Sequence, residues 1–449
     1  LSLDANTTAS NNTAVGTSTL TANTTGADNS ALGMQALKAN TTGSYNVAVG
    51  KNSMEANTTG ANNTALGRES LASNTTADNN TAVGYNTLLA NTTGAANTAV
   101  GYNALSGGSN TASDNTAVGM DALTSTTTGA ENSAFGSEAL DANTTGAENV
   151  ALGYGAMSNS TTGSYNTAVG KSSLSSNTTA SRNTAVGKAS LAANTTGAEN
   201  VAVGSLSLDA NTTGSRNVAV GDNALTAAET ASDNTIIGSN AGMAITTGAE
   251  NVGVGRAAMA ANTTGGSNVA IGYIALDANT TGSGNTAVGR EALSANSTGA
   301  SNTALGRNAG LSVTTGSNNL LLGLDAGQSG SPGGAISTGS NEIVLGDENI
   351  TEAHIQVDWT VASDARDKTD VEDLNVGLEF VNQLQPKTYR WDQRSLYGDE
   401  RDIFPDGTYK KDQLDVGFLA QDVSSLEEQL GFGKSDKKNI ISSLSEDGQ

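Results

Sequence analysis

The sequence predicts a mainly β protein: a trimeric parallel β-roll or β-helix solenoid of 17-residue repeats, followed by a small α+β domain. One 17-residue unit recurs nineteen times between Asn12 and Gly323, with a single 18-residue step between Asn97 and Asn115. Every unit contains β-prone residues followed by an invariant glycine. Charged residues become frequent only near residue 363. A fixed period this short is typical of solenoids and fibres.

The idealised unit reads N-T-A-V-G-x-x-A-L-x-x-N-T-T-G-x-x, and we number its residues as positions 1 to 17. Positions 2 to 4 suit a strand, and position 5 is glycine in all nineteen copies. Position 9 is Leu or Met in sixteen copies. Positions 12 to 15 are usually Asn-Thr-Thr-Gly, a sequence that favours a turn. Each unit therefore predicts two short strands and two turns, forming one rung of a stack.

Apolar side chains are scarce in each rung: Ala, Val, Ala and Leu are the regular ones. At about 0.8 kcal/mol per buried methylene, they offset little of the roughly 1–2 kcal/mol of backbone entropy lost per residue. Adjacent strand residues such as Ala14 and Val15 point to opposite faces, so both faces need cover. We expect a parallel homotrimer in which positions 4 and 9 are buried. At about 4.8 Å per rung, the shaft would span about 90 Å.

Composition excludes several classes of function. The 449 residues carry a net charge of −23, no Cys, and one His, His354. Disulfides, thiolate metal sites, histidine triads and zinc clusters are therefore excluded, and we expect no metal and no cofactor. His354 is interpreted as an exposed strand residue. The charge argues against binding nucleic acid, and no apolar run is long enough for membrane insertion.

Three further interpretations of the repeat were weighed. The Asn-Thr-Thr turns match the N-glycosylation pattern, but turn chemistry accounts for them. Stacked Thr residues occur in ice-binding solenoids, but here the Thr pair lies in a turn and not on a flat face. Acidic residues precede position 1 and could bind calcium between chains, although a solvated acidic edge is the favoured interpretation; these include Asp28, Glu131, Glu148, Glu199 and Glu250.

The regular repeat ends at Gly323, so residues 1–323 are expected to form the shaft. Residues 324–362 form a connector and neck, which contains a flexible insertion (324–341), a displaced copy of the repeat (342–346) and a strand (353–361). Residues 363–449 form the second domain, with 19 acidic and 11 basic residues from position 364 onward. Its pattern predicts a helix from Leu378 to Leu384, ended by Pro386, then a strand at 387–391 and a helix at 423–430.

The repeat resembles that of the head domains of trimeric autotransporter adhesins, which fold as a left-handed parallel β-roll. The unit here is longer because the Asn-Thr-Thr-Gly turn is added. This resemblance covers residues 12–323 and implies an architecture more than a biological role.

Three motifs in the second domain carry a more specific resemblance. Ser363–Lys368 fits S-D-x-R-x-K, and Leu384–Trp391 and Val416–Val423 follow it. In this order they resemble the self-cleaving intramolecular chaperone domain at the C-terminus of phage tailspikes, tail fibres and endosialidases. That family trimerises, guides folding of the β-structured part and then cleaves itself.

The resemblance implies that Ser363 is the nucleophile, Lys368 the base and Ser363–Asp364 the scissile bond. The chemistry is reasonable, because a serine needs a neighbouring base and a desolvated lysine loses its proton more readily. On spacing alone, Ser363 would cap a turn and Lys368 would be solvated. The family's long C-terminal helix would begin near Gln449, and Leu1 lies inside a repeat-like phrase, so we expect the sequence to be truncated at both ends.

The sequence therefore predicts the shaft and chaperone of a homotrimeric phage tail fibre in the virion. Its expected partners are other tail or baseplate proteins and a host-cell receptor, probably a glycan in nature. The alternative is the head of a bacterial trimeric surface adhesin. Any enzymatic activity would be at most a single-turnover self-cleavage, because the shaft lacks paired carboxylates outside the repeat and an inserted catalytic domain.

Overall fold

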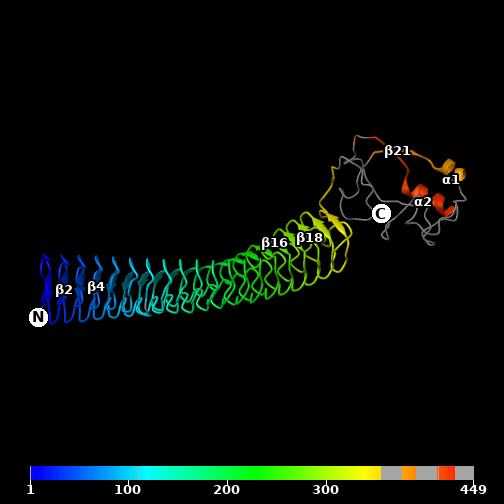
Figure 1. The fold of residues 1–449 in the computed structure, drawn as a ribbon. Helices are drawn as coiled ribbons and strands as arrows, with labels where there is room; N and C mark the ends of the chain where they lie inside the picture. Colours follow the sequence, from blue (N-terminus) through cyan, green and yellow to red (C-terminus); the bar gives the residue numbers. More distant parts are fainter. Residues whose placement is uncertain (1, 109, 355–376, 391–411, 413, 430–449) are drawn as a thin grey trace. The chain divides into compact units, whose positions relative to one another are not determined.

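The computed structural model describes residues 2–108, 110–354, 377–390, 412 and 414–429 (Figure 1). Its contacts divide the chain into two units, Leu1–Ala353 and His354–Gln449. The first unit is a β-solenoid, as the 17-residue period predicts. The described part of the second unit contains short helices and one small antiparallel sheet.

The solenoid contributes one three-residue strand per rung, and each strand pairs in parallel with the strand of the next rung. Ala14 lies opposite Ala31, and Ala168 opposite Ala185, so equal repeat positions stack on one another. The strands are β1 (Thr13–Val15), β2 (Ser30–Leu32), β3 (Val47–Val49), β4 (Thr64–Leu66), β5 (Thr81–Val83), β6 (Thr98–Val100), β7 (Thr116–Val118), β8 (Ser133–Phe135), β9 (Val150–Leu152), β10 (Thr167–Val169), β11 (Thr184–Val186), β12 (Val201–Val203), β13 (Val218–Val220), β14 (Thr235–Ile237), β15 (Val252–Val254), β16 (Val269–Ile271), β17 (Thr286–Val288), β18 (Thr303–Leu305), β19 (Leu320–Leu322) and β20 (Ile343–Leu345).

The expected second strand of each unit is wrong: positions 7 to 11 form turns. Ala189 and Leu191, at positions 7 and 9, have φ values of 52° and 53°. These left-handed residues curve the backbone too sharply for an extended strand. The segment still bonds to the next rung, because the Leu191 N–H donates to the Ser207 carbonyl at 2.9 Å. Rung-to-rung hydrogen bonding therefore continues without strand geometry.

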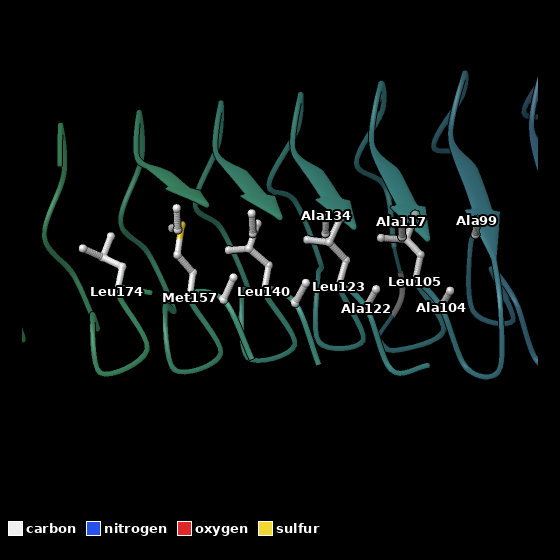
Figure 2. Close-up of a cluster of buried hydrophobic side chains, with 14 of the residues drawn as sticks. Ala99, Ala104, Leu105, Ala117, Ala122, Leu123, Ala134, Leu140, Met157 and Leu174 are labelled. Atoms are coloured by element: carbon white, nitrogen blue, oxygen red, sulfur yellow. The ribbon is translucent and has the colours of Figure 1, made fainter. Parts of the chain in front are cut away.

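The apolar core consists of three columns of side chains, at positions 3, 8 and 9. Figure 2 shows the position 9 column, in which Leu123, Leu140, Met157 and Leu174 stack one above the other. These side chains are fully buried, as is Ala134 at position 3. Position 9 is therefore in the core, as expected. The core is thin, because two of its three columns consist mainly of alanine.

Asparagine fills much of the remaining interior, which the sequence interpretation did not predict. Position 1 is a buried asparagine from Asn29 to Asn319. The Asn200 backbone N–H donates to Asn183 Oδ1 at 3.0 Å, and Asn200 Nδ2 donates to Asn183 Oδ1 at 3.2 Å and to the Gly214 carbonyl at 2.9 Å. Each amide thus bonds to neighbouring rungs through both its donor and its acceptor, so burial leaves it satisfied.

A second asparagine column stands at position 12. Asn57 Nδ2 donates to Asn40 Oδ1 at 2.9 Å and to the Gly60 carbonyl at 3.0 Å. This column is interrupted where the chain has Ala228, Ile245 and Val313 at position 12. The fold therefore tolerates apolar residues at position 12, whereas position 1 is asparagine in every repeat.

Glycine at position 5 is required by the backbone. Gly187 has a φ of 136°, a region that side chains other than glycine rarely adopt. A Cβ on Gly16, at the same position, would also lie 2.5 Å from the Gly33 carbonyl oxygen. Position 15 is less demanding, because Ala77 and Ala180 stand where most repeats have glycine.

The solenoid ends with the displaced repeat. Strand β20 pairs with β19, and Leu320 lies opposite Ile343, a step of 23 residues. The expectation that residues 342–346 continue the repeat is confirmed. The segment before them bonds to the stack, since the Thr314 N–H donates to the Ser337 carbonyl at 2.8 Å.

The second unit contains α1 (Gly377–Gln383), β21 (Lys387–Tyr389), β22 (Asp415–Gly417) and α2 (Ala420–Gln429). Phe380 from α1 and Val423 and Leu426 from α2 form a small buried cluster. Both predicted helices and the strand after Pro386 are thus present. Most of the strand predicted at 353–361 lies outside the described residues.

The asparagine ladder generates a stability prediction. We expect Asn183→Ala to lower the free energy of unfolding by about 1–3 kcal/mol or more, because the buried Asn200 N–H loses its acceptor. Asn194→Ala, at position 12, leaves no backbone N–H unpaired and should cost only about 1 kcal/mol. Thermal unfolding followed by circular dichroism compares the two variants. Equal destabilisation would contradict a special role for position 1.

Candidate functional site

The outward side chains of the strands form a continuous apolar stripe. Position 4 carries Val, Leu, Ile or Phe in every repeat, while alanine at position 3 points inward. Leu32 and Leu305 are 50% and 52% exposed. Because the strands are in register, side chains at positions 2 and 4 repeat along the stack about every 4.8 Å. We call the residues at positions 2 and 4 of β1–β20 the outer strand face.

This face is larger than a monomeric protein normally exposes, because isolated apolar patches seldom exceed a few hundred Å². Position 4 was expected to be buried, but in the single chain it is exposed or half-buried. No part of the same rung can cover it, since the strand's inner face already contacts the core. Burial of position 4 therefore requires another molecule.

Basic and aromatic residues line one side of the outer strand face, at position 6. Seven of the ten Lys and Arg residues within residues 1–353 lie in this column: Lys51, Arg68, Lys171, Lys188, Arg256, Arg290 and Arg307. Four tyrosines share it, and the rings of Tyr85 and Tyr102 stack with centroids 5.3 Å apart. Arg256 and Arg290 each lie within 6 Å of the Tyr273 ring. We call this column the basic flank.

Acidic residues line the opposite side, at position 17, which directly precedes each strand's asparagine. They are Asp28, Asp114, Glu131, Glu148, Glu199, Asp233 and Glu250, and we call this column the acidic flank. Arg182 and Arg216 also stand in it, paired with Glu199 at 3.8 Å and with Asp233 at 2.6 Å. The hydrogen bond from Arg216 lowers the pKa of Asp233.

The described residues offer no metal centre of the usual kind. No group of three or more His, Asp or Glu side chains in that part of the chain is arranged to hold an ion. Nor does the described part contain a helix long and apolar enough to cross a membrane.

Three partly buried carboxylates at position 10 escaped the sequence interpretation. Burial raises the pKa of Asp141, Asp209 and Asp277, and hydrogen bonds from nearby backbone groups offset part of this shift. One oxygen of each carboxylate has no partner within the chain. Other repeats place Thr, Lys or Ala at position 10, so no sequence signal marked these sites.

The predicted catalytic residues lie outside the described part of the chain. This applies to Ser363, Lys368 and the Ser363–Asp364 bond. The two later motifs do fall largely on described elements, and β21 of the first pairs with β22 of the second, Thr388 opposite Val416. The fold therefore brings together two motifs that are well separated in the sequence.

Comparison with known families identifies this segment. Residues 363–431 match the family model described as chaperone of endosialidase, a range that begins at Ser363 and includes all three motifs. No curated protein and no solved structure matches the chain.

A β-solenoid shaft followed by such a domain defines a tail fibre-like protein. Its C-terminal segment belongs to the chaperone-of-endosialidase family, which confirms the resemblance carried by the three motifs.

The half-buried aspartates generate a pH prediction. Because burial raises their pKa above the ordinary 3.8, the folded state binds these protons more tightly than the unfolded state. Their contribution favours folding below pH 3.8 and is lost as the pH rises through the raised pKa. We expect replacement of Asp141, Asp209 and Asp277 by Asn to raise the melting temperature at neutral pH, with a smaller gain near pH 4.

The matched control for this experiment is Glu229→Gln at an exposed site, which should change the melting temperature little at either pH. A triple Asn variant that is less stable than the original at neutral pH would contradict the assignment of the shifts to burial.

Proposed function

We propose that this protein is the shaft of a homotrimeric phage tail fibre used for host attachment, and that its C-terminal domain assembles the trimer and then releases itself. The observation that supports this most strongly is the chaperone-of-endosialidase match placed directly after a β-solenoid. The uncovered outer strand face supplies a physical reason for assembly. The fibre would belong to the virion and contact other tail or baseplate proteins and a host receptor.

Trimerisation satisfies the part of the chain that a monomer leaves exposed. Three parallel shafts can bury their outer strand faces against one another around a common axis, which covers position 4 in every rung. The C-terminal unit also exposes apolar side chains in the single chain, including Leu378, Val381 and Val416. Burial of such surface on assembly is favourable by about 25 cal/mol per Å².

A chaperone domain suits a shaft made of nearly identical rungs. Chains displaced by 17 residues would still stack strand on strand, so the repeat by itself discriminates weakly against a slipped arrangement. Joining the three chains at their C-terminal ends lowers the entropic cost of bringing them together in one register. Removal of the domain afterwards would leave the folded fibre kinetically trapped.

In the proposed cleavage, Lys368 accepts the proton of the Ser363 hydroxyl, which acts as the nucleophile. The net reaction is hydrolysis of the Ser363–Asp364 peptide bond. It should follow folding, because only an assembled site can desolvate Lys368 and hold it against Ser363. Asp367 precedes Lys368 and, as an adjacent carboxylate, favours the charged form of the lysine.

A bacterial surface adhesin remains the second candidate function, because the repeat resembles adhesin head domains. An adhesin should continue into a coiled coil and a membrane anchor, whereas this chain continues into a chaperone-of-endosialidase domain. That match favours the tail fibre.

The trimer generates the first prediction. We expect light scattering of the full chain to show a trimer, and Val186→Asp to weaken it by several kcal/mol, because three unpaired carboxylates would be buried together. The control Thr196→Asp adds the same charge at an exposed site of the next rung and should assemble normally. A monodisperse, folded monomer of the unaltered chain would rule out the trimer.

Cleavage generates the second prediction. The folded protein should release a fragment that begins Asp364-Ala365-Arg366, detectable by mass spectrometry. Ser363→Ala should leave folding intact and abolish cleavage, and Lys368→Ala should do nearly the same. Continued cleavage of the Ser363→Ala chain at this bond would exclude the dyad.

If the folded trimer is never cleaved, the domain is a retained chaperone and Asp367 is the first residue to change. Asp367→Leu removes the carboxylate beside Lys368 and should then restore the reaction.

A further inference from the structure

The two charged columns beside the outer strand face are complementary in sign. The basic flank holds seven cations and one carboxylate, Asp222, in its nineteen repeat positions. The acidic flank holds seven carboxylates and two arginines, each already paired with an acid of the same column. Each column therefore carries an excess of one charge along the full length of the shaft.

We propose that the basic flank of each chain meets the acidic flank of a neighbouring copy, so that the two columns line every seam of the assembly. This inference rests on the proposed trimer, and it names the surface and the charges that join its chains. The partner is a second copy of this chain, because only a parallel stack with the same rung spacing presents acidic residues at matching intervals.

The direction of the strands decides which flanks meet. Each strand runs across the stack, with position 17 before it and position 6 after it. When three parallel shafts turn their strand faces toward a common axis, the strands of one level follow one another head to tail. The end of one strand then approaches the beginning of the next, so position 6 meets position 17. Such a heterologous contact closes around a rotation axis.

Antiparallel packing would give the opposite result. Turning one shaft end over end places basic flank against basic flank and acidic flank against acidic flank. Like charges facing each other along the whole shaft would oppose that arrangement. The charged columns thus select parallel assembly, a choice that the apolar stripe cannot make because its side chains are similar at both ends.

The contacts within one chain leave these columns available. Arg256 and Arg307 take part in no ion pair of the described chain, and Arg256, Arg290 and Arg307 are all exposed. Arg290 pairs with the adjacent Glu291 at its rim. On the acidic flank, Glu250 accepts a hydrogen bond from the Ser267 hydroxyl and remains exposed. Both flanks can therefore reach a neighbouring chain without breaking the rung that carries them.

Cross-linking tests the contact directly, since the chain has no cysteine of its own. Ser301 and Arg307 flank β18 on opposite sides, and six residues of largely extended chain, about 20 Å, separate them. A disulfide needs Cα atoms within about 7 Å, so the two sites cannot join within one chain. We expect Ser301→Cys with Arg307→Cys, treated with a short bismaleimide, to give covalent dimers and trimers on a denaturing gel.

Arg307→Cys alone is the control and should give no covalent dimers, because like flanks do not meet. Dimers from this single variant would overturn the inference, as would a double variant that stays unlinked while light scattering still shows a trimer. Absence of any trimer in the unaltered protein would instead contradict the proposed function.

A second experiment tests the electrostatics with matched charge. Replacing Arg256, Arg290 and Arg307 by Gln removes three positive charges from the basic flank. Replacing Thr264, Thr298 and Thr315 by Glu changes the net charge equally, in the same rungs but at exposed position 14. We expect only the Gln variant to lower the melting temperature of the trimer at low salt, by a few degrees. In 1 M salt, where the Debye length is about 3 Å, the difference should disappear. Equal effects of the two variants would contradict the seam.

Discussion

The whole shaft depends on hydrogen bonding between rungs at a constant interval of 17 residues. Each strand residue finds its partner one unit away, and the turns obey the same rule: the Thr41 N–H donates to the Thr58 carbonyl at 2.8 Å. Equal positions of the repeat therefore lie one above another, and a single residue type becomes a column. Asparagine suits a buried column because its amide carries a donor and an acceptor, so each copy satisfies the next. Leucine and alanine suit one because they fill space without polar groups. A change at one position alters the core in one rung, but a change in the unit would alter it in all.

This arrangement also divides the apolar residues of the strand between two partners. Alanine at position 3 packs inside the chain, where the thin roll has little room, while the larger residues of position 4 lie outside. The chain thus spends its bulkier strand side chains on a surface that only association can bury. The uniformity that makes the shaft regular also makes its surface nearly the same at every level. A domain of different composition at the C-terminal end can supply the specificity that the repeat lacks, and residues 363–431 match a family of that kind.

The two ends of the chain consequently differ in how their chemistry is encoded. In the shaft, a property such as charge belongs to a column, and Arg182 or Asp222 can reverse its sign locally without changing the character of the flank. In the C-terminal unit each residue has its own surroundings. Phe380 meets Val423 and Leu426 from another helix, and Thr388 lies opposite Val416. The proposed pair of Ser363 and Lys368 belongs to this second kind of encoding, and its geometry lies outside the described residues.

The sequence by itself determined the period, the parallel stacking, the opposite faces of Ala14 and Val15, the helices near 378 and 423, and the family of the C-terminal segment. These follow from repetition, from side-chain alternation and from motifs, all of which are local or periodic. Only the tertiary structure decided that positions 7 to 11 are turns, because Leu191 adopts a left-handed conformation that its residue type does not favour. It also decided that asparagine at position 1 is buried, since local turn propensity says nothing about the neighbouring rung that satisfies the amide. The half-buried Asp209 and the two charged flanks likewise became visible only when residues 17 apart were placed side by side.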